Sequence, residues 1–147
     1  MSLIENKKAK LNFSVKETYV AGLELSGAEV KSLRAKLGSI RGARVIVRGG
    51  EAYLIGMTIP PYQSANTAAG YNPERNRKLL LSKKEIGELL DAESKKGLTV
   101  VPLEVYNTGR YLKARIAIVE GKNKADRRED LKRLEAKREA DRVLKRK

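Results

Sequence analysis

Among the side chains of this sequence that could take part in chemistry, Lys and Arg are the most numerous. The 147 residues include 32 Lys and Arg against 18 Asp and Glu, which gives a formal net charge of +14 at pH 7. An excess of this size is best explained by a polyanionic partner, either nucleic acid or an anionic membrane. The longest apolar runs, such as 98–103, are far shorter than a bilayer span. Nucleic acid is therefore the favoured partner, and no membrane contact is expected.

Residue types that catalyse reactions are scarce. The chain has no Cys and no His, which removes disulfides, thiolate nucleophiles, the usual zinc sites and the commonest general base. An enzyme would have to use Asp126, Glu129 and Asp130 as metal-binding carboxylates for phosphodiester cleavage. Arg127 and Arg128 stand among them, in a segment that we expect to be flexible. We therefore expect no enzyme activity, no catalytic residue, no metal site and no cofactor.

The elements that would position these cations are mainly strands. The segments 44–48 and 51–55 are joined by Gly49-Gly50, whose freedom at positive φ suits a two-residue hairpin turn. The segments 98–106 and 111–119 flank a second turn, and the latter alternates apolar with mostly basic residues, which predicts one buried and one basic face. The pattern favours a small β-barrel with short helices embedded among its strands.

Two helix starts are marked by capping boxes, in which a Ser and a Glu three residues later satisfy the free amides of the first turn. They are Ser26 with Glu29 and Ser82 with Glu85, and for Glu29 we favour this capping role over an RNA contact. Each box precedes a short apolar stripe, which predicts that both helices plug the barrel. The stripes are Val30, Leu33 and Leu37, and Ile86, Leu89 and Leu90.

The last 27 residues differ from the rest. They hold 12 basic and 6 acidic residues, a net +6, and are rich in helix formers. Their apolar residues make too thin a stripe for a stable isolated helix, so we expect the segment to be disordered alone or helical when bound. We therefore divide the chain into a globular body, 1–120, and a basic C-terminal tail, 121–147.

An ordered set of short blocks spans the chain. They are Asn6-Lys7-Lys8-Ala9, Gly27-Ala-Glu-Val-Lys-Ser-Leu-Arg34, Ile59-Pro-Pro-Tyr62, Arg75-Asn-Arg-Lys-Leu-Leu-Leu81, Gly97-Leu-Thr-Val-Val-Pro-Leu103, Gly121-Lys122 and Asp126-Arg127-Arg128. In their order and spacing the chain resembles the small protein B (SmpB) family, the SsrA-binding proteins that bind transfer-messenger RNA. No single block is specific, but jointly they are.

The resemblance implies a fold, partners and site residues. It implies an antiparallel oligonucleotide-binding (OB-type) barrel that binds the tRNA-like part of transfer-messenger RNA in trans-translation, the rescue of stalled ribosomes. The tail would occupy the vacant mRNA channel near the decoding centre of the small ribosomal subunit. We accordingly expect a cytoplasmic monomer. Position by position, RNA binding is implied for Asn6, Lys7, Leu80 and Lys113, and ribosome contact for Gly121, Lys122, Asp126, Arg127 and Arg128.

Some further RNA contacts are suggested by residue type. Folded RNA is read through its backbone, its 2′-hydroxyls and a few unstacked bases, which Arg34 and exposed aromatic rings could contact. Tyr19 and Tyr62 are candidates for stacking, although a structural role in the barrel is the more common fate of such a Tyr. The chain departs from the family pattern at the expected RNA face and near the tail, at Leu11, Phe13, Val20, Glu120 and Asn123.

One alternative function remains open at this point. Small basic barrels serve many RNA-binding proteins, so a general basic OB-fold RNA-binding or ribosome-associated structural protein would explain the composition equally well. The ordered blocks argue against that alternative, whereas the charge does not.

Overall fold

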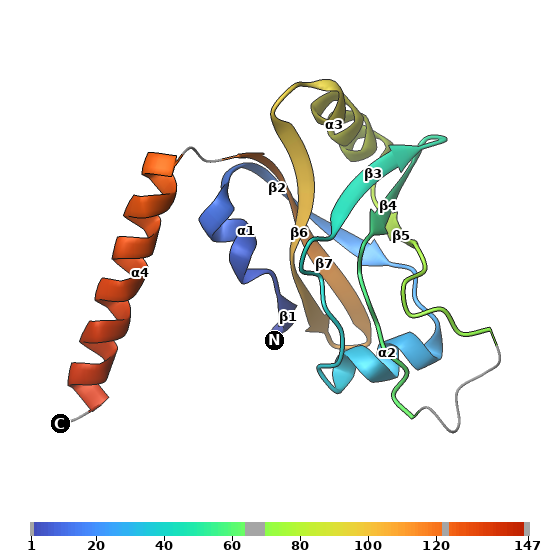
Figure 1. Cartoon of the computed structure of the whole chain (residues 1–147). Helices are drawn as coiled ribbons and strands as arrows, with labels where there is room; N and C mark the ends of the chain where they lie inside the picture. Colours follow the sequence, from blue (N-terminus) through green and yellow to red (C-terminus); the bar gives the residue numbers. More distant parts are fainter. Residues whose placement is uncertain (1, 64–69, 122–123, 146–147) are drawn as a thin grey trace.

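The chain folds into one curved sheet with short helices at its edges and a long helix at the C-terminus (Figure 1). The computed structural model describes residues 2–63, 70–121 and 124–145, leaving out the side chains at 10, 11, 124–127, 129, 130 and 141–145. In chain order the elements are β1 Ser2–Glu5, α1 Lys7–Asn12, β2 Phe13–Leu23, α2 Gly27–Arg34, β3 Arg44–Arg48, β4 Glu51–Ile55, β5 Arg77–Leu80, α3 Lys83–Ser94, β6 Leu98–Thr108, β7 Tyr111–Gly121 and α4 Lys124–Lys145.

The strands form an antiparallel sheet in the order β1-β6-β7-β2-β5-β4-β3. Three 11-residue strands, β2, β6 and β7, make its centre. The sheet curls until β3, at one edge, packs against β6, in the manner of an OB-type barrel. In the described residues the sheet is not closed by hydrogen bonds, because β3 packs against β6 without forming a hydrogen-bonded ladder with it. The prediction of a mainly β fold with embedded short helices is confirmed.

Both predicted hairpins are present. Gly49 and Gly50 take φ values of 60° and 76° between Arg48 and its partner Glu51, as a two-residue turn with positive φ requires. In the second hairpin β6 continues to Thr108, two residues further than predicted, and pairs there with Tyr111. The turn is therefore shorter than the predicted segment 107–110.

The prediction that β7 has one buried and one basic face is only partly correct. Its inward residues lie in the main core, and Lys113 and Arg115 point to the other face, as expected. Ala117 and Val119 on that outer face are buried as well, against Ala9 of α1. The sequence pattern had not indicated α1, the helix that covers this second apolar cluster. The part of this face formed by Ala117 and Val119 is therefore apolar and buried, and only the part with Lys113 and Arg115 is basic.

Both capping boxes are confirmed by reciprocal hydrogen bonds between each Ser and its Glu. The predicted apolar stripes are each wrong at one residue. Leu37 lies beyond the end of α2 and is 37% exposed, because the chain turns at Lys36, which has a φ of 62°. Leu90 is 52% exposed, because Leu89 and Ala92 occupy the core-facing side of α3.

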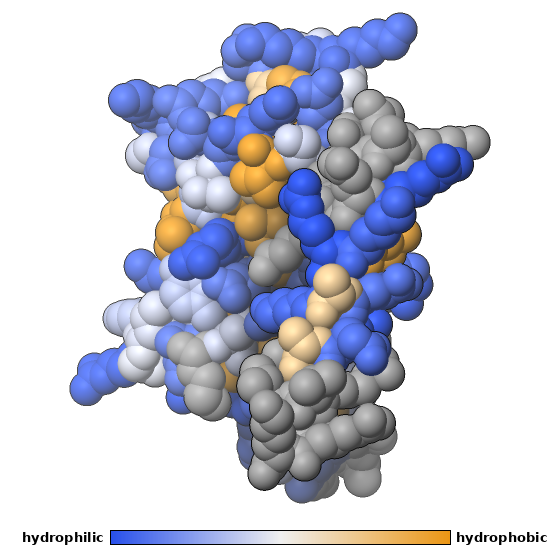
Figure 2. All heavy atoms as spheres, turned by 90° about the vertical axis from the view of Figure 1, so that its left-hand side faces the viewer, coloured by the Kyte–Doolittle hydropathy of each residue, from blue (hydrophilic) through white to orange (hydrophobic). Residues whose placement is uncertain are grey.

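The tail forms α4, which contacts α1. Leu134 is half-buried, whereas Leu131 is 46% exposed, in agreement with a thin apolar stripe. The face of the molecule that carries this helix is largely hydrophilic, with apolar side chains confined to small patches (Figure 2). No helix in the described ranges is long and apolar enough to cross a membrane. Folding of the tail upon binding remains a prediction.

Candidate nucleic-acid interface

A row of residues crosses the outer face of four adjacent strands. Tyr106 of β6 lies opposite Lys113 of β7, Lys113 lies opposite Gly22 of β2, and Gly22 lies opposite Leu80 of β5. At the neighbouring positions along the strands Ala21, Leu79, Val105, Leu112 and Ala114 are buried in the core, and the alternation of side chains along a strand therefore turns this row outward. We call Tyr106, Lys113, Gly22 and Leu80 the outer row. It brings together two predicted RNA-binding residues, Leu80 and Lys113, which are 33 positions apart in the sequence.

Gly22 makes this row a groove and not a ridge. A Cβ atom added at Gly22 would lie 3.2 Å from the Cβ atom of Leu80, closer than such atoms normally approach. With hydrogen in its place, Leu80 lies against bare backbone and still remains 54% exposed. The groove has an apolar floor with cations at its rim, and its lining residues are Gly22, Leu23, Leu25, Val30, Leu80, Arg110, Tyr111, Leu112 and Lys113. Such a surface can contact a base or ribose while its cations contact phosphates.

Arg34 is bonded to Arg110, a residue that lines this groove. Its guanidinium Nη2 donates a hydrogen bond of 3.1 Å to the carbonyl oxygen of Arg110 in the β6–β7 turn. This bond joins α2 to the tip of the hairpin that carries Lys113. The structure therefore gathers Arg34, Leu80 and Lys113 at one end of the sheet, as candidates for a single RNA contact.

A second outward pair adjoins the row. Arg115 forms an ion pair of 3.0 Å with Glu104, and its guanidinium lies 5.5 Å from the centroid of the Tyr106 ring. On its other side Arg115 faces Val20, which is 45% exposed. Val20 is one of the departures from the family pattern. Its apolar side chain cannot form an ion pair with Arg115, whose acidic partner in the structure is Glu104.

Asn6 and Lys7 lie away from the outer row. The Asn6 side chain is buried; its carbonyl oxygen accepts from the Ala9 amide at 3.3 Å and its amide donates to the Pro102 carbonyl at 3.1 Å. Asn6 thus caps α1 and fixes this helix to β6. Lys7 is exposed and lines a hollow together with Arg115 and residues of α4. An RNA contact by either residue remains a prediction.

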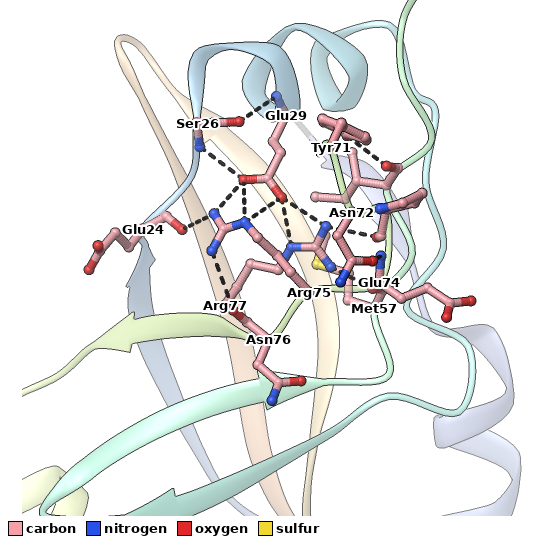
Figure 3. A network of polar contacts seen from close by, with 12 residues as sticks. Glu24, Ser26, Glu29, Met57, Tyr71, Asn72, Glu74, Arg75, Asn76 and Arg77 are labelled. Carbon is pink, nitrogen blue, oxygen red and sulfur yellow. Dashed lines mark hydrogen bonds and ion pairs between the residues drawn. The ribbon is translucent and has the colours of Figure 1, made fainter. Parts of the chain in front are cut away.

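The largest fully buried side chain is that of Arg77, for which the sequence had suggested no role. The side chain of Arg77 is fully buried on β5; its Nε donates to Glu29 at 2.9 Å, and its Nη atoms donate to the carbonyls of Met57 and Pro73 at 2.6 and 2.8 Å (Figure 3). Arg75 donates to the same Glu29 carboxylate from the other side. Glu29 therefore does more than cap a helix, because it holds two Arg residues that are 46 and 48 positions away.

This network, which we call the Glu29 network, fixes α2 to the sheet. Burial by itself would raise the pKa of Glu29, but hydrogen bonds from Arg75, the Ser26 amide and Arg77 outweigh burial and lower the pKa. The carboxylate is therefore ionised at neutral pH and balances one of the two guanidinium charges. Because α2 carries Arg34 and supplies Val30 to the groove, the network positions one wall of the candidate interface. The capping pattern in the sequence indicated the contact between Ser26 and Glu29, but it did not indicate that Arg75 and Arg77 join them.

The two Tyr candidates have different environments. Tyr19 is 9% exposed and its hydroxyl donates to Glu88 at 2.7 Å; burial, followed by this hydrogen bond, raises its pKa. The structural role that we favoured is confirmed for Tyr19. Tyr62 is 45% exposed, and the Lys31 ammonium lies 5.1 Å from its ring centroid. Tyr62 therefore offers an accessible aromatic ring beside a cation.

The root of the tail lies at the far end of β7. Gly121, the last residue of β7, is exposed and pairs with Phe13 of β2. Arg128 on α4 is also exposed. Lys122 and Asn123 lie outside the described residues, as do the side chains of Leu11, Asp126, Arg127, Glu129 and Asp130. Within the described ranges no group of three acidic side chains could hold a metal ion.

Comparisons with known proteins point to one family. The family model described as "SmpB protein" matches residues 3–146. An SsrA-binding protein of Coxiella burnetii is 46% identical over 140 residues, 95% of this chain and 88% of the relative. One of Gloeothece citriformis is 40% identical over 144 residues, 98% of this chain and 93% of the relative. A solved structure titled "tmRNA-SmpB: a journey to the center of the bacterial ribosome" superposes with a TM-score of 0.69 at 39% identity, covering 87% of this chain and 93% of that one.

Proposed function

The chain belongs to the SmpB protein family, and from this premise we propose that it binds transfer-messenger RNA and acts in the rescue of stalled ribosomes by trans-translation. The observation that carries the proposal is the outer row. It joins an exposed Leu80, a glycine that opens a groove and Lys113 on three neighbouring strands. Relatives named SsrA-binding proteins match this chain over nearly its whole length, which supports transfer-messenger RNA as the partner.

The tRNA-like part of the RNA is the ligand that we assign to the outer row. The exposed cations, including Arg110, supply affinity through phosphates, and this affinity falls as salt rises. Specificity comes from the shape of the folded RNA and from unstacked nucleotides that reach the apolar floor. Lys113 and Arg110 line the groove, and Arg34 is bonded to Arg110. Lys7 on α1 is a separate exposed cation, to which we assign a second contact with the RNA.

The tail has a separate task in this proposal. We assign Gly121, Lys122, Asp126, Arg127 and Arg128 to the small ribosomal subunit, where the tail would lie in the vacant mRNA channel beside the decoding centre. The protein thus delivers its RNA to the ribosome and tests whether the channel is empty. This role needs no catalytic residue, cofactor or metal ion, and we expect a monomer that acts in the cytoplasm together with ribosomes.

The decisive experiment compares two RNAs. Binding of the full chain to transfer-messenger RNA from its own host and to bulk tRNA is measured by filter binding or fluorescence anisotropy across a salt series. We expect tight and selective binding of transfer-messenger RNA at physiological salt. Equal binding of both RNAs, lost steeply as salt rises, would instead identify a general basic RNA-binding protein and overturn the proposal.

A further inference from the structure

An exposed aromatic ring lies beside α2, outside the outer row. The ammonium group of Lys31, on α2, lies 5.1 Å from the centroid of the Tyr62 ring, and Tyr62 is 45% exposed. The contact is a cation–π interaction, in which the cation lies over a face of the ring. Because nearly half of Tyr62 still faces solvent, the ring has surface left on which a second planar group can stack. We call Lys31 and Tyr62 the α2 platform.

The segment that leads to Tyr62 is firmly held. Ile59 is fully buried; its amide donates to the Pro73 carbonyl at 2.9 Å, and its carbonyl accepts from the Tyr71 hydroxyl at 2.7 Å. Two prolines separate Ile59 from Tyr62, and each proline ring fixes its own φ at about −65°. Tyr62 is thus the first side chain beyond an anchored and stiff segment. A ring that is held in place beforehand loses little conformational freedom when it binds, which favours affinity.

The Glu29 network connects the two parts of the α2 platform. Glu29 lies on α2, two residues before Lys31, and accepts from the buried Arg77 guanidinium (Figure 3). The same guanidinium donates at 2.8 Å to the Pro73 carbonyl, which also anchors the segment before Tyr62. A buried ion pair is weak evidence for stability, but its directional hydrogen bonds fix the helix relative to this segment. The network therefore determines how Lys31 meets Tyr62.

The α2 platform continues the candidate interface. Lys31 and Arg34 are three residues apart and both exposed, so they are neighbours on one side of α2. Arg34 is bonded to Arg110, which lines the groove together with Lys113. None of these four side chains has an ion-pair partner in the described part of the chain. A series of unpaired cations therefore leads from the outer row across α2 to Tyr62.

We propose that the α2 platform binds an unstacked nucleotide of transfer-messenger RNA, with the base on the Tyr62 ring and the phosphate at Lys31. The RNA chain continues past Arg34 and Arg110 into the groove of the outer row. Aromatic rings stack on bases of any sequence, and neighbouring cations bind the backbone. The inference rests on the proposed function, because it takes the RNA in the groove to be transfer-messenger RNA. It adds an anchoring point on a helix to the contact made by the strands.

Binding of the full chain to the tRNA-like fragment of transfer-messenger RNA tests the stacked ring. Tyr62→Leu should weaken binding about tenfold, within the range for loss of one stacked base, whereas Tyr62→Phe should bind within about twofold of the wild type. Both variants should unfold at the urea concentration at which the wild type unfolds, because Tyr62 is exposed and lies outside the core. Wild-type affinity of Tyr62→Leu for the fragment would overturn the inference.

The phosphate contact is tested by Lys31→Ala, with Lys96→Ala as the matched control. Lys96 is also exposed and has no ion-pair partner in the described ranges, but it precedes β6, whereas Arg110 follows that strand. Over a salt series, Lys31→Ala should weaken binding of the fragment about fivefold and reduce the salt slope by about 0.7–0.9, as for one lost phosphate contact. Lys96→Ala should change neither. Equal losses in the two variants would show that charge acts without a defined site, which overturns the inference.

A fluorescent reporter detects the stacking itself. The chain contains no Trp, so the variant Tyr62→Trp carries a single indole, whose emission falls when it stacks on a base. The fragment should reduce this emission by half or more. Leu90→Trp, at a 52% exposed position on α3, is the control and should keep its emission. Absence of quenching at position 62 would overturn the inference, and so would quenching by isolated small ribosomal subunits in place of the fragment.

Failure of the proposed function is a separate result. A wild type that binds the fragment and bulk tRNA equally would overturn the proposed function. A wild type that is selective for the fragment, with Tyr62→Leu and Lys31→Ala binding as tightly as the wild type, would overturn this inference alone.

Discussion

The body and the tail of this protein differ in how much apolar surface they bury. The body buries a large apolar core, and its outer row is assembled from strands whose register is set by that core. The tail is a single helix with a half-buried Leu134, an exposed Leu131 and contact with the six-residue helix α1. A surface that must match a folded RNA needs a rigid support, whereas a segment that enters a channel needs length and charge. The comparison predicts that damage to the two regions separates stability, RNA binding and ribosome function.

The largest effect is expected from the tail and should leave the body unaffected. Replacing Asp126 and Arg127 together by Ala should abolish tagging of stalled peptides, because we assign these residues to the ribosome. Affinity for transfer-messenger RNA should remain nearly that of the wild type. Tagging is measured in a reconstituted translation system and affinity by filter binding. Loss of RNA binding in this variant would contradict the assignment of RNA binding to the body and of ribosome contact to the tail.

Removing Glu29 should have the largest effect on the body. Glu29→Ala leaves Arg77 as a fully buried cation without its carboxylate, which costs about 3–5 kcal/mol of the free energy of unfolding. The loss is measured by urea denaturation at neutral pH. Glu51→Ala, which removes an exposed partner of Lys78, is the matched control and should cost much less, because solvent screens surface ion pairs. Equal losses would show that the Glu29 network does not stabilise the body.

The Glu29 network also predicts how stability responds to acid. The folded-state pKa of Glu29 is lowered, so its stabilising contribution is complete above the unfolded value of about 4.3. Below that pH the unfolded chain takes up a proton before the folded chain does, and the contribution is lost as pH falls through the folded pKa. Wild-type stability should therefore decline more steeply below about pH 4.3 than that of Glu29→Gln, which has no carboxylate to protonate. Parallel pH profiles of the two proteins in thermal denaturation would contradict this.

A smaller change is expected from one cation of the outer row. Lys113→Ala should weaken binding of transfer-messenger RNA roughly tenfold, or about 1.4 kcal/mol, and reduce the salt slope by about 1. Lys78→Ala is the control, because Lys78 lies on neighbouring β5 but is paired with Glu51 at 2.9 Å. Anisotropy titrations over a salt series measure both. If the two variants weaken binding equally, the cationic surface acts as a whole and the outer row is not a defined site.

The smallest effect is expected on stability when the tail is removed. A chain ending at Gly121 loses α4 but none of the main core, so its free energy of unfolding should fall by less than about 1 kcal/mol, as for most surface changes. Calorimetry of the truncated and full chains measures the difference. A loss of several kcal/mol would mean that α4 is part of the body.

Local sequence determined the features that depend on neighbouring residues. Gly49-Gly50 specified the first hairpin, and Ser26 with Glu29 specified the start of α2, because turns and caps are made by residues a few positions apart. The ordered blocks likewise led to the SmpB family. The exposure of Leu80, which an RNA contact needs, could not be deduced from three consecutive leucines. It depends on Gly22 in a neighbouring strand.

Only the tertiary structure decided which distant residues meet. The register of β2 with β5 and β7 placed Gly22 beside both Leu80 and Lys113, and the fold brought Arg75 and Arg77 to Glu29 across more than 45 positions. Helix α1 covered Ala117 and Val119, which alternation alone had assigned to a basic face. The physical reason is the same in each case. Strand register and helix docking are set by how the whole core packs, and no local pattern of residues contains that information.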